Sequence, residues 1–209
     1  MKKIAFKVVL VLFVLVSGGC AFTQANLNVK YDSEAARVGP LASIRPVTLD
    51  VQEFVDKRPE KLRIGYKRNG FGQNTADIVT QKPVPQIVKD ALMTEFIKNG
   101  HTVSATGNSL AISGEITSFW FELQVNFTTV EFMGTVEVDL NLVDPGSGAV
   151  LYSQSYQGHY NETRMGGLEG TVERVMNTAL ERMVRDMSTD PKLLEILKMR
   201  ALTVNNDKG

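Results

Sequence analysis

The chain has 209 residues, and its 23 Lys and Arg balance 23 Asp and Glu, so its formal net charge is zero. Nucleic-acid-binding domains carry a clear basic excess, so this balance excludes a nucleic-acid partner. A single cysteine also excludes an internal disulfide and a metal site built from several thiolates.

The first 19 residues have the features of a secretory signal peptide. Three lysines precede an apolar run over residues 8–16, which is much shorter than the ~20 residues of a membrane-spanning helix. The small residues 17–19 then lead directly to Cys20. A charged region, a short apolar region and small residues in this order predict a signal peptide over residues 1–19.

The end of this signal resembles the lipobox of bacterial lipoproteins. In that pattern, a diacylglyceryl group is attached to the cysteine sulfur, the signal is cut before the cysteine, and the new amino terminus is acylated. Gly18 and Gly19 fit the pattern, whereas Ser17 stands where leucine is usual. The resemblance implies lipid attachment at Cys20 and, because Ala21 rather than Asp follows, the outer membrane. Secretion with a free thiol and an uncleaved anchor are the alternatives.

The segment of residues 20–45 has no sustained periodicity, apart from a short extended piece near residues 27–31. It therefore predicts a lipidated tether, which would reach roughly 80–90 Å when fully extended. We expect one periplasmic domain over residues 46–200 and a flexible tail over residues 201–209.

The first predicted strand spans residues 46–56, where apolar residues alternate. The polar stretch that follows predicts a long loop over residues 57–82 with one or two short extended pieces, and loops of this length are often functional. Asp56 and Arg58 lie where the strand passes into the loop. We expect them to organise the loop through a salt bridge, with direct binding as the alternative.

Apolar residues with helical spacing predict amphipathic helices over residues 84–100 and 171–187. Asn99-Gly100 ends the first helix. A short helix over residues 190–200 should follow the second, with Asp190 as its cap.

Alternation predicts strands over residues 101–106, 109–127, 130–142 and 149–160. The apolar parity changes at Thr117-Ser118, which predicts a β-bulge. These elements predict an α+β fold, a two-layer sandwich in which a mainly antiparallel sheet of about five strands is covered on one face by two amphipathic helices.

Few residues carry a chemical signature. His101 and His159 lack metal-ligand spacing, so we expect no metal and no cofactor. The nucleophile–base pattern of a hydrolase is also missing, and we expect a protein without enzymatic activity. The aromatic row around Trp120 predicts sheet core with one exposed ring or, alternatively, a partner- or lipid-binding patch. The candidate partner-binding residues are Asp56, Arg58, Tyr66 and Trp120.

Three features together resemble the YajG-type uncharacterised bacterial lipoproteins. They are the lipobox with its tether, the segment VTLDVQEFVDKRPEKLRIG, and the ending MSTDPKLLEILK after a long helix. The resemblance implies an outer-membrane lipoprotein that faces the periplasm, and it implies no catalytic residues.

We therefore expect a non-enzymatic accessory lipoprotein that binds an envelope protein through the loop of residues 56–82 or an exposed sheet edge. The alternative is a lipid- or glycan-binding auxiliary subunit of an envelope transport system. That alternative predicts an apolar groove between helix and sheet, with Trp120 at its rim. An envelope hydrolase is a third and weaker hypothesis.

Overall fold

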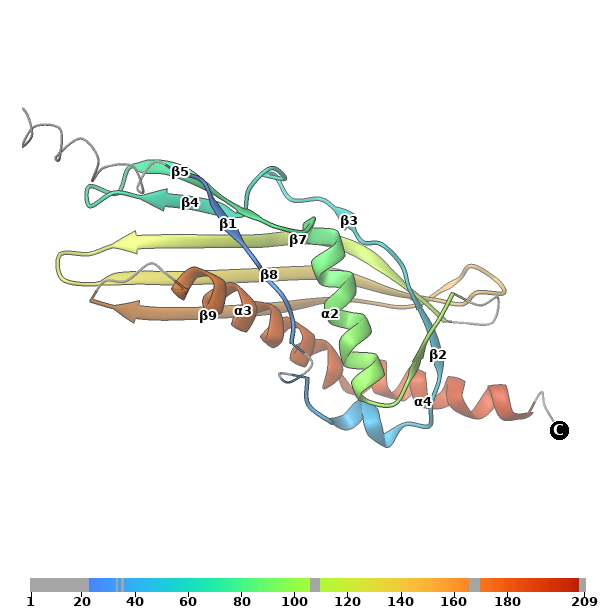
Figure 1. The fold of residues 1–209 in the computed structure, drawn as a ribbon. Coiled ribbons are helices and arrows are strands. Elements are labelled where there is room, and N and C mark those ends of the chain that lie inside the picture. Colours follow the sequence, from blue (N-terminus) through green and yellow to red (C-terminus); the bar gives the residue numbers. More distant parts are fainter. Residues whose placement is uncertain (1–22, 33, 35, 106–109, 166–169, 207–209) are drawn as a thin grey trace, which may run out of the picture.

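The computed structural model describes residues 23–32, 34, 36–105, 110–165 and 170–206 (Figure 1). Its elements are, in chain order, β1 (Ala25–Leu27), the 3-10 helix η2 (Pro40–Ser43), β2 (Thr48–Val51), β3 (Val55–Asp56), β4 (Gly65–Arg68), β5 (Asn74–Thr80), α2 (Val84–Lys98), β6 (Thr102–Val103), β7 (Leu110–Val125), β8 (Val130–Val143), β9 (Val150–Arg164), α3 (Thr171–Ser188) and α4 (Pro191–Asn206).

The long strand β7 is the centre of the sheet. One edge of β7 pairs with β8, which pairs in turn with β9, and both pairings are antiparallel. The other edge is shared by three short strands that all run parallel to β7: β2 near Ile112, β3 near Ile116 and β4 at Phe121. The predicted bulge is confirmed, because the β7–β8 register shifts between Ile116 and Ser118 and leaves Thr117 unpaired.

The expected sheet of about five mainly antiparallel strands is wrong. The described residues form a mixed sheet of nine strands, in which β1, β2, β3 and β4 all make parallel pairs. The short helix predicted after α3 is present as α4 and is longer than expected. Strands β4 and β5, of four and seven residues, lie in the segment that was expected to be a loop, and β1, of three residues, lies in the expected tether. The predicted strand over residues 101–106 is present as β6, and β3 is the end of the predicted first strand. Segments as short as β1 and β4 do not show a visible alternation. The predicted first strand is also split, because the chain bends after Val51 so that Phe54 is buried and Val55 is exposed.

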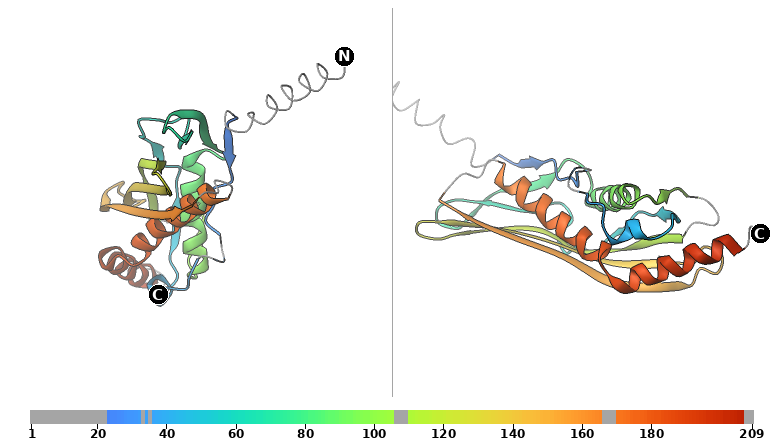
Figure 2. Two further views of the ribbon diagram at one scale, coloured as in Figure 1. Left: turned by 90° about the vertical axis from the view of Figure 1, so that its left-hand side faces the viewer. Right: turned by 90° about the horizontal axis from the view of Figure 1, so that it is seen from below.

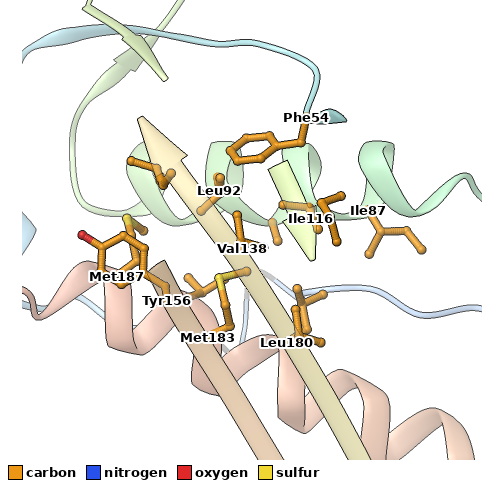
Figure 3. Packing of buried hydrophobic residues seen from close by; sticks show 14 of the residues in the cluster. Phe54, Ile87, Leu92, Ile116, Val138, Tyr156, Leu180, Met183 and Met187 are labelled. Carbon is orange, nitrogen blue, oxygen red and sulfur yellow. The ribbon is translucent and has the colours of Figure 1, made fainter. Parts of the chain in front are cut away.

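The helices α2 and α3 cover the same face of the sheet (Figures 1 and 2). Their apolar stripes, including Leu92, Leu180 and Met183, meet the apolar rows of the strands in one core (Figure 3). The helix α3 approaches the strands closely because glycine stands at the contact. A Cβ atom at Gly158 would lie 1.9 Å from the carbonyl oxygen of Ala179.

The segment before β2, which the sequence assigned to the tether, packs onto the domain. Its strand β1 runs parallel to β5, and Val29 and Leu41 are buried in the core. The backbone amide of Lys30 donates to Asn177 Oδ1 of α3 (3.0 Å), and the Tyr31 hydroxyl donates to Glu95 Oε2 of α2 (2.7 Å). This segment therefore belongs to the fold from Thr23 onward.

The C-terminal helices meet at Asp190. As predicted, Asp190 caps α4, and its carboxylate accepts from the Lys192 amide (2.9 Å). It also accepts from the hydroxyls of Tyr152 and Tyr156 of β9, which ties the corner between α3 and α4 to the sheet. Helix α4 extends to Asn206, beyond the predicted start of the tail, and buries Ala201. Within the described chain, no helix is both long and apolar enough to cross a membrane.

Candidate binding groove

The predicted salt bridge between Asp56 and Arg58 is present and is part of a larger network. Arg58 Nε and Nη2 donate to the two oxygens of Asp56 at 2.9 and 2.8 Å. The remaining guanidinium hydrogens reach the carbonyl oxygens of Lys61, Arg63 and Phe119, at 3.2 to 3.3 Å. All five donors of this buried guanidinium are thus used. The network fixes the loop after β3 against β7.

The charge of Asp56 is maintained by this network. Partial burial acts to raise the pKa of the carboxyl group, but the hydrogen bonds donated by the Arg58 side chain and backbone outweigh it, so the pKa of Asp56 lies below its usual value. Asp56 therefore stays ionised and paired. Because the donors of Arg58 are all engaged, the pair shapes the loop and leaves direct recognition to its neighbours.

Tyr66 and Trp120, the other two predicted residues, are in contact. Their rings are 5.8 Å apart between centroids and nearly perpendicular. The Arg63 guanidinium lies 5.0 Å from the Tyr66 ring centroid and donates to the Tyr66 hydroxyl (2.6 Å). Arg63 also pairs with Glu60 (3.2 Å) and Asp77 (3.3 Å). The Trp120 ring is thereby supported on one side by a fixed stack.

A groove of about 500 Å³ lies beside Trp120. It is on the sheet face opposite the helices, because Phe119 and Phe121 point into the core and Trp120 between them points away. The loop after Arg58 forms one wall, and the bulge in β7 together with β8 forms the other. Its lining consists of Arg58, Pro59, Glu60, Thr117, Ser118, Phe119, Trp120, Thr135 and Glu137. Of the four predicted residues, Arg58 and Trp120 line the groove, whereas Asp56 and Tyr66 contact these two residues without lining it.

The open face around the groove is acidic. The side chains of β7 and β8 on this face include Glu115, Glu122, Glu131, Glu137 and Asp139. Lys57 pairs with Glu115 at 3.7 Å through exposed side chains, and the partly buried Arg68 pairs with Glu122 at 3.8 Å. His159 of β9 lies within 3.9 Å of Glu137 and hydrogen-bonds to Thr135 (3.1 Å). The groove therefore offers an aromatic ring, hydroxyl groups and carboxylates.

Sequence reasoning missed the far wall of the groove. Thr135 and Glu137 lie on β8, directly opposite Trp120 and Ser118 of β7. Only the register of β7 against β8 brings Thr135 and Glu137 to the groove. The change of apolar parity at Thr117 was the one feature of the sequence that pointed to this register. Among the described residues, no group of three or more His, Cys, Asp or Glu side chains could hold a metal ion. Cys20 and the signal peptide of residues 1–19 lie outside the described residues.

The chain matches the model of a family of uncharacterised lipoproteins, Lipoprotein_16, over residues 40–198. It therefore belongs to this lipoprotein family, and the resemblance to the YajG-type lipoproteins is confirmed. As a member of a lipoprotein family, the chain is a membrane-anchored protein of the cell envelope. No curated protein sequence matches it.

A solved structure shares the fold at low sequence identity. The protein XCC0632 from Xanthomonas campestris has a TM-score of 0.51 and 12% identity, and the match covers 89% of this chain and 98% of that one. A minor lipoprotein from Acinetobacter baumannii has a TM-score of 0.39 and 9% identity over 77% of this chain and 94% of its own. The PelC dodecamer from Paraburkholderia phytofirmans has a TM-score of 0.39 and 12% identity, covering 66% of this chain and 86% of its own.

Proposed function

We propose that this lipoprotein is a non-enzymatic accessory protein that binds an envelope protein through the groove beside Trp120. The observation that carries the proposal is the groove itself, about 500 Å³ in volume, with a partly buried tryptophan in its lining. Tryptophan next to a well-shaped depression is a common anchor for binding energy. The buried network of Arg58 holds one wall in place, so little ordering is needed when a partner binds.

Charge suggests what the partner presents. The open sheet face is acidic, and Glu137 and Glu60 stand on opposite walls of the groove. Complementary charge steers association and disfavours wrong partners. We therefore propose a partner segment with a basic side chain beside an apolar one, the basic group between the two carboxylates and the apolar group on the Trp120 ring.

The groove supports binding better than hydrolysis. The Thr135 hydroxyl and His159 Nδ1 are 3.1 Å apart, which is a distance expected of a nucleophile and its base. Acyl transfer also needs free backbone amides or other donors aimed at the developing oxyanion. Thr135 lies in the middle of a three-stranded ladder, opposite both Trp120 and His159, and its neighbouring peptide groups belong to that ladder.

We further propose that the protein is attached through acyl chains on Cys20 to the outer membrane and faces the periplasm. The support is the lipobox-like sequence around Gly18 and Gly19, followed by Ala21 rather than Asp. Two or three acyl chains hold a protein to a bilayer stably, whereas a single chain gives reversible binding.

The test is site-specific crosslinking in whole cells. A photoreactive residue at Thr117, which is exposed on the groove rim, should give a crosslinked protein. Trp120→Ala and Glu137→Lys should abolish that product, whereas Glu131→Lys, further along β8, should retain it. A probe at Ser153, exposed on β9 away from the groove, is the matched control. If the crosslinked product is unchanged in both Trp120→Ala and Glu137→Lys, the proposal is wrong.

The second candidate is a lipid- or glycan-binding subunit of a transport system. The observation that favours a glycan is the Trp120 ring beside the Thr135 hydroxyl and the Glu137 carboxylate, since sugar rings stack on aromatic faces while their hydroxyls bind polar groups. The groove lies on the open face, not between helix and sheet. Recovery of a glycan or lipid, without protein, on the Thr117 probe would favour this candidate.

A further inference from the structure

The three most exposed large apolar side chains of the described chain are at turns or strand ends. Phe127 is fully exposed (104%) in the turn between β7 and β8, and Phe71 is 92% exposed in the turn between β4 and β5. Met165 is 90% exposed directly after β9. Single exposed apolar residues are common in soluble domains. These three residues therefore indicate an interaction surface only if they lie close together.

The strand register places all three at the same end of the sheet. Gly65 of β4 pairs in parallel with Phe121 of β7, so both strands run toward this end. Val130, at the start of β8, pairs with Arg164, at the end of β9. Figure 1 shows the two hairpin turns and the end of β9 side by side at the left. Because neighbouring strands are about 4.8 Å apart, the three side chains form a row roughly 15–20 Å wide.

The chain that leads to Cys20 reaches the described structure near this row. The strand β1 runs parallel to β5, with Ala25 opposite Ile78, so the chain before β1 comes from the direction of the β4–β5 turn. The Thr23 carbonyl oxygen accepts a hydrogen bond from Lys67 Nζ (2.8 Å), just before that turn. Three residues span at most about 11 Å, so Cys20 is within that distance of Thr23 whatever its conformation.

We propose that this end of the sheet, defined by Phe71, Phe127 and Met165, docks on the lipid bilayer and inserts these side chains between the headgroups. The proposal rests on acylation of Cys20, which is part of the proposed function. A short link to the acyl chains holds the row against the membrane. There the aromatic and apolar side chains are removed from water, while the backbones of the strands keep their hydrogen bonds to each other. Turns can contribute side chains in this way because only their tips enter the lipid.

The chain offers a direct measurement of this docking. Cys20 is its single cysteine, so in the acylated protein an introduced cysteine is the only free thiol. Phe71→Cys, Phe127→Cys and Met165→Cys would each be labelled with a polarity-sensitive fluorophore in the full acylated chain. The protein is placed in phosphatidylethanolamine–phosphatidylglycerol vesicles with brominated acyl chains. Val150→Cys, at the opposite end of β9, and Leu62→Cys, in the loop before β4, are exposed controls.

The expected result is quenching by brominated lipid at positions 71, 127 and 165 that is several-fold stronger than at the two controls, together with protection from aqueous iodide. Quenching by iodide at all five positions would overturn the docking. Protection from both quenchers at the three positions would overturn it as well, because a second copy or another protein would then cover this end. If the protein does not float with the vesicles, the proposed acylation is wrong, and the docking proposal fails with it. If the protein floats but brominated lipid does not quench the three positions, only the docking proposal is wrong.

Discussion

At the scale of single residues, Arg58 determines whether the groove has a fixed wall. The residue is 4% exposed, and its guanidinium donates to both oxygens of Asp56 and to three backbone carbonyls. Arg58→Ala would leave the Asp56 carboxylate without its ion-pair partner, with only the backbone amide of residue 58 still donating to it, and would remove the guanidinium donors from those carbonyls. Removal of one partner of a buried ion pair costs about 3–5 kcal/mol, and Asp56 is partly exposed. We therefore expect the free energy of unfolding in urea to fall by about 3 kcal/mol.

The neighbouring Lys57 is the control for that substitution. It pairs with Glu115 at 3.7 Å, and both side chains are about half exposed, so Lys57→Ala should cost less than about 1 kcal/mol. Arg58→Lys keeps the charge but replaces a planar fork of five donors with one ammonium group, and it should give an intermediate loss. If Arg58→Ala is as stable as Lys57→Ala, the network does not fix the loop.

A second residue-scale prediction concerns pH and His101. The ring is buried between Leu41 and Val47, donates from Nε2 to the Leu41 carbonyl (3.2 Å) and accepts at Nδ1 from the Val47 amide (3.3 Å). Burial lowers the pKa of His101, and the hydrogen bond to Leu41 opposes that shift only in part. The folded state therefore binds this proton less readily than the unfolded state, so stability falls as pH decreases below about 6.5.

The measurement is the free energy of unfolding between about pH 7 and pH 5. His101→Gln should flatten the decline, because the group that must remain neutral is gone. His159→Gln, which removes the exposed histidine of β9, is measured alongside as the other histidine variant. Equal slopes for the native chain and the His101 variant would show that another group is responsible.

The candidate site divides into a part that the sequence could reveal and a part that it could not. Asp56 and Arg58 are two residues apart, so their pairing is a local property, and the prediction of a salt bridge was correct. Trp120 could be singled out as the one tryptophan on a strand. Thr135 and Glu137 look like ordinary outward-facing residues of β8, and only the pairing of Trp120 with Thr135 gives them a place in the groove.

At the scale of elements, the contact between α3 and β9 depends on a glycine. A Cβ atom at Gly158 would lie 1.9 Å from the Ala179 carbonyl oxygen and 2.4 Å from the Met183 nitrogen, both in the backbone of α3. A side-chain rotation cannot relieve such an overlap, so the helix must move away from the sheet. We expect Gly158→Ala to lower the free energy of unfolding by about 3 kcal/mol, as measured by urea or thermal denaturation.

Gly70→Ala is the matched control. No atom lies within 4 Å of a Cβ at Gly70, and its φ is outside the left-handed region. The extra methyl group should leave stability unchanged or raise it by less than about 1 kcal/mol. Comparable losses for both alanine variants would mean that helix α3 does not depend on close approach at Gly158.

The elements that the sequence revealed are those long enough to repeat a pattern. Helices α2 and α3 and strands β7, β8 and β9 each have at least 14 residues and were all predicted. The strands β1 and β4 have three and four residues, and their parallel partners lie far away in sequence. The parallel pairing of short strands along one edge of β7 cannot be recognised in the sequence of those strands. It depends on where segments that are distant in sequence meet that edge.

At the scale of the whole molecule, the proposed docking determines how far the groove lies from the membrane surface. Trp120 lies five residues before Val125, the last residue of β7 at the docking end, and a strand rises about 3.3 Å per residue. The groove would therefore stand roughly 15–20 Å from the row of exposed side chains. A partner in the groove would then itself be close to the membrane, which agrees with a partner from the envelope.

The last prediction concerns the segment before β2, which lacks periodicity because its regular elements, β1 and η2, have only three and four residues. Removal of the segment would take away the burial of Val29, Leu41 and Ile44, and each of these side chains stabilises the fold by about 1.5–3 kcal/mol. A chain that starts at Arg45 should therefore be less stable than a chain that starts at Thr23 by about 5 kcal/mol, and it should aggregate through the uncovered helices. Urea denaturation of the two purified chains checks this. Stabilities within about 1 kcal/mol of each other would mean that the segment is a tether that only rests on the domain.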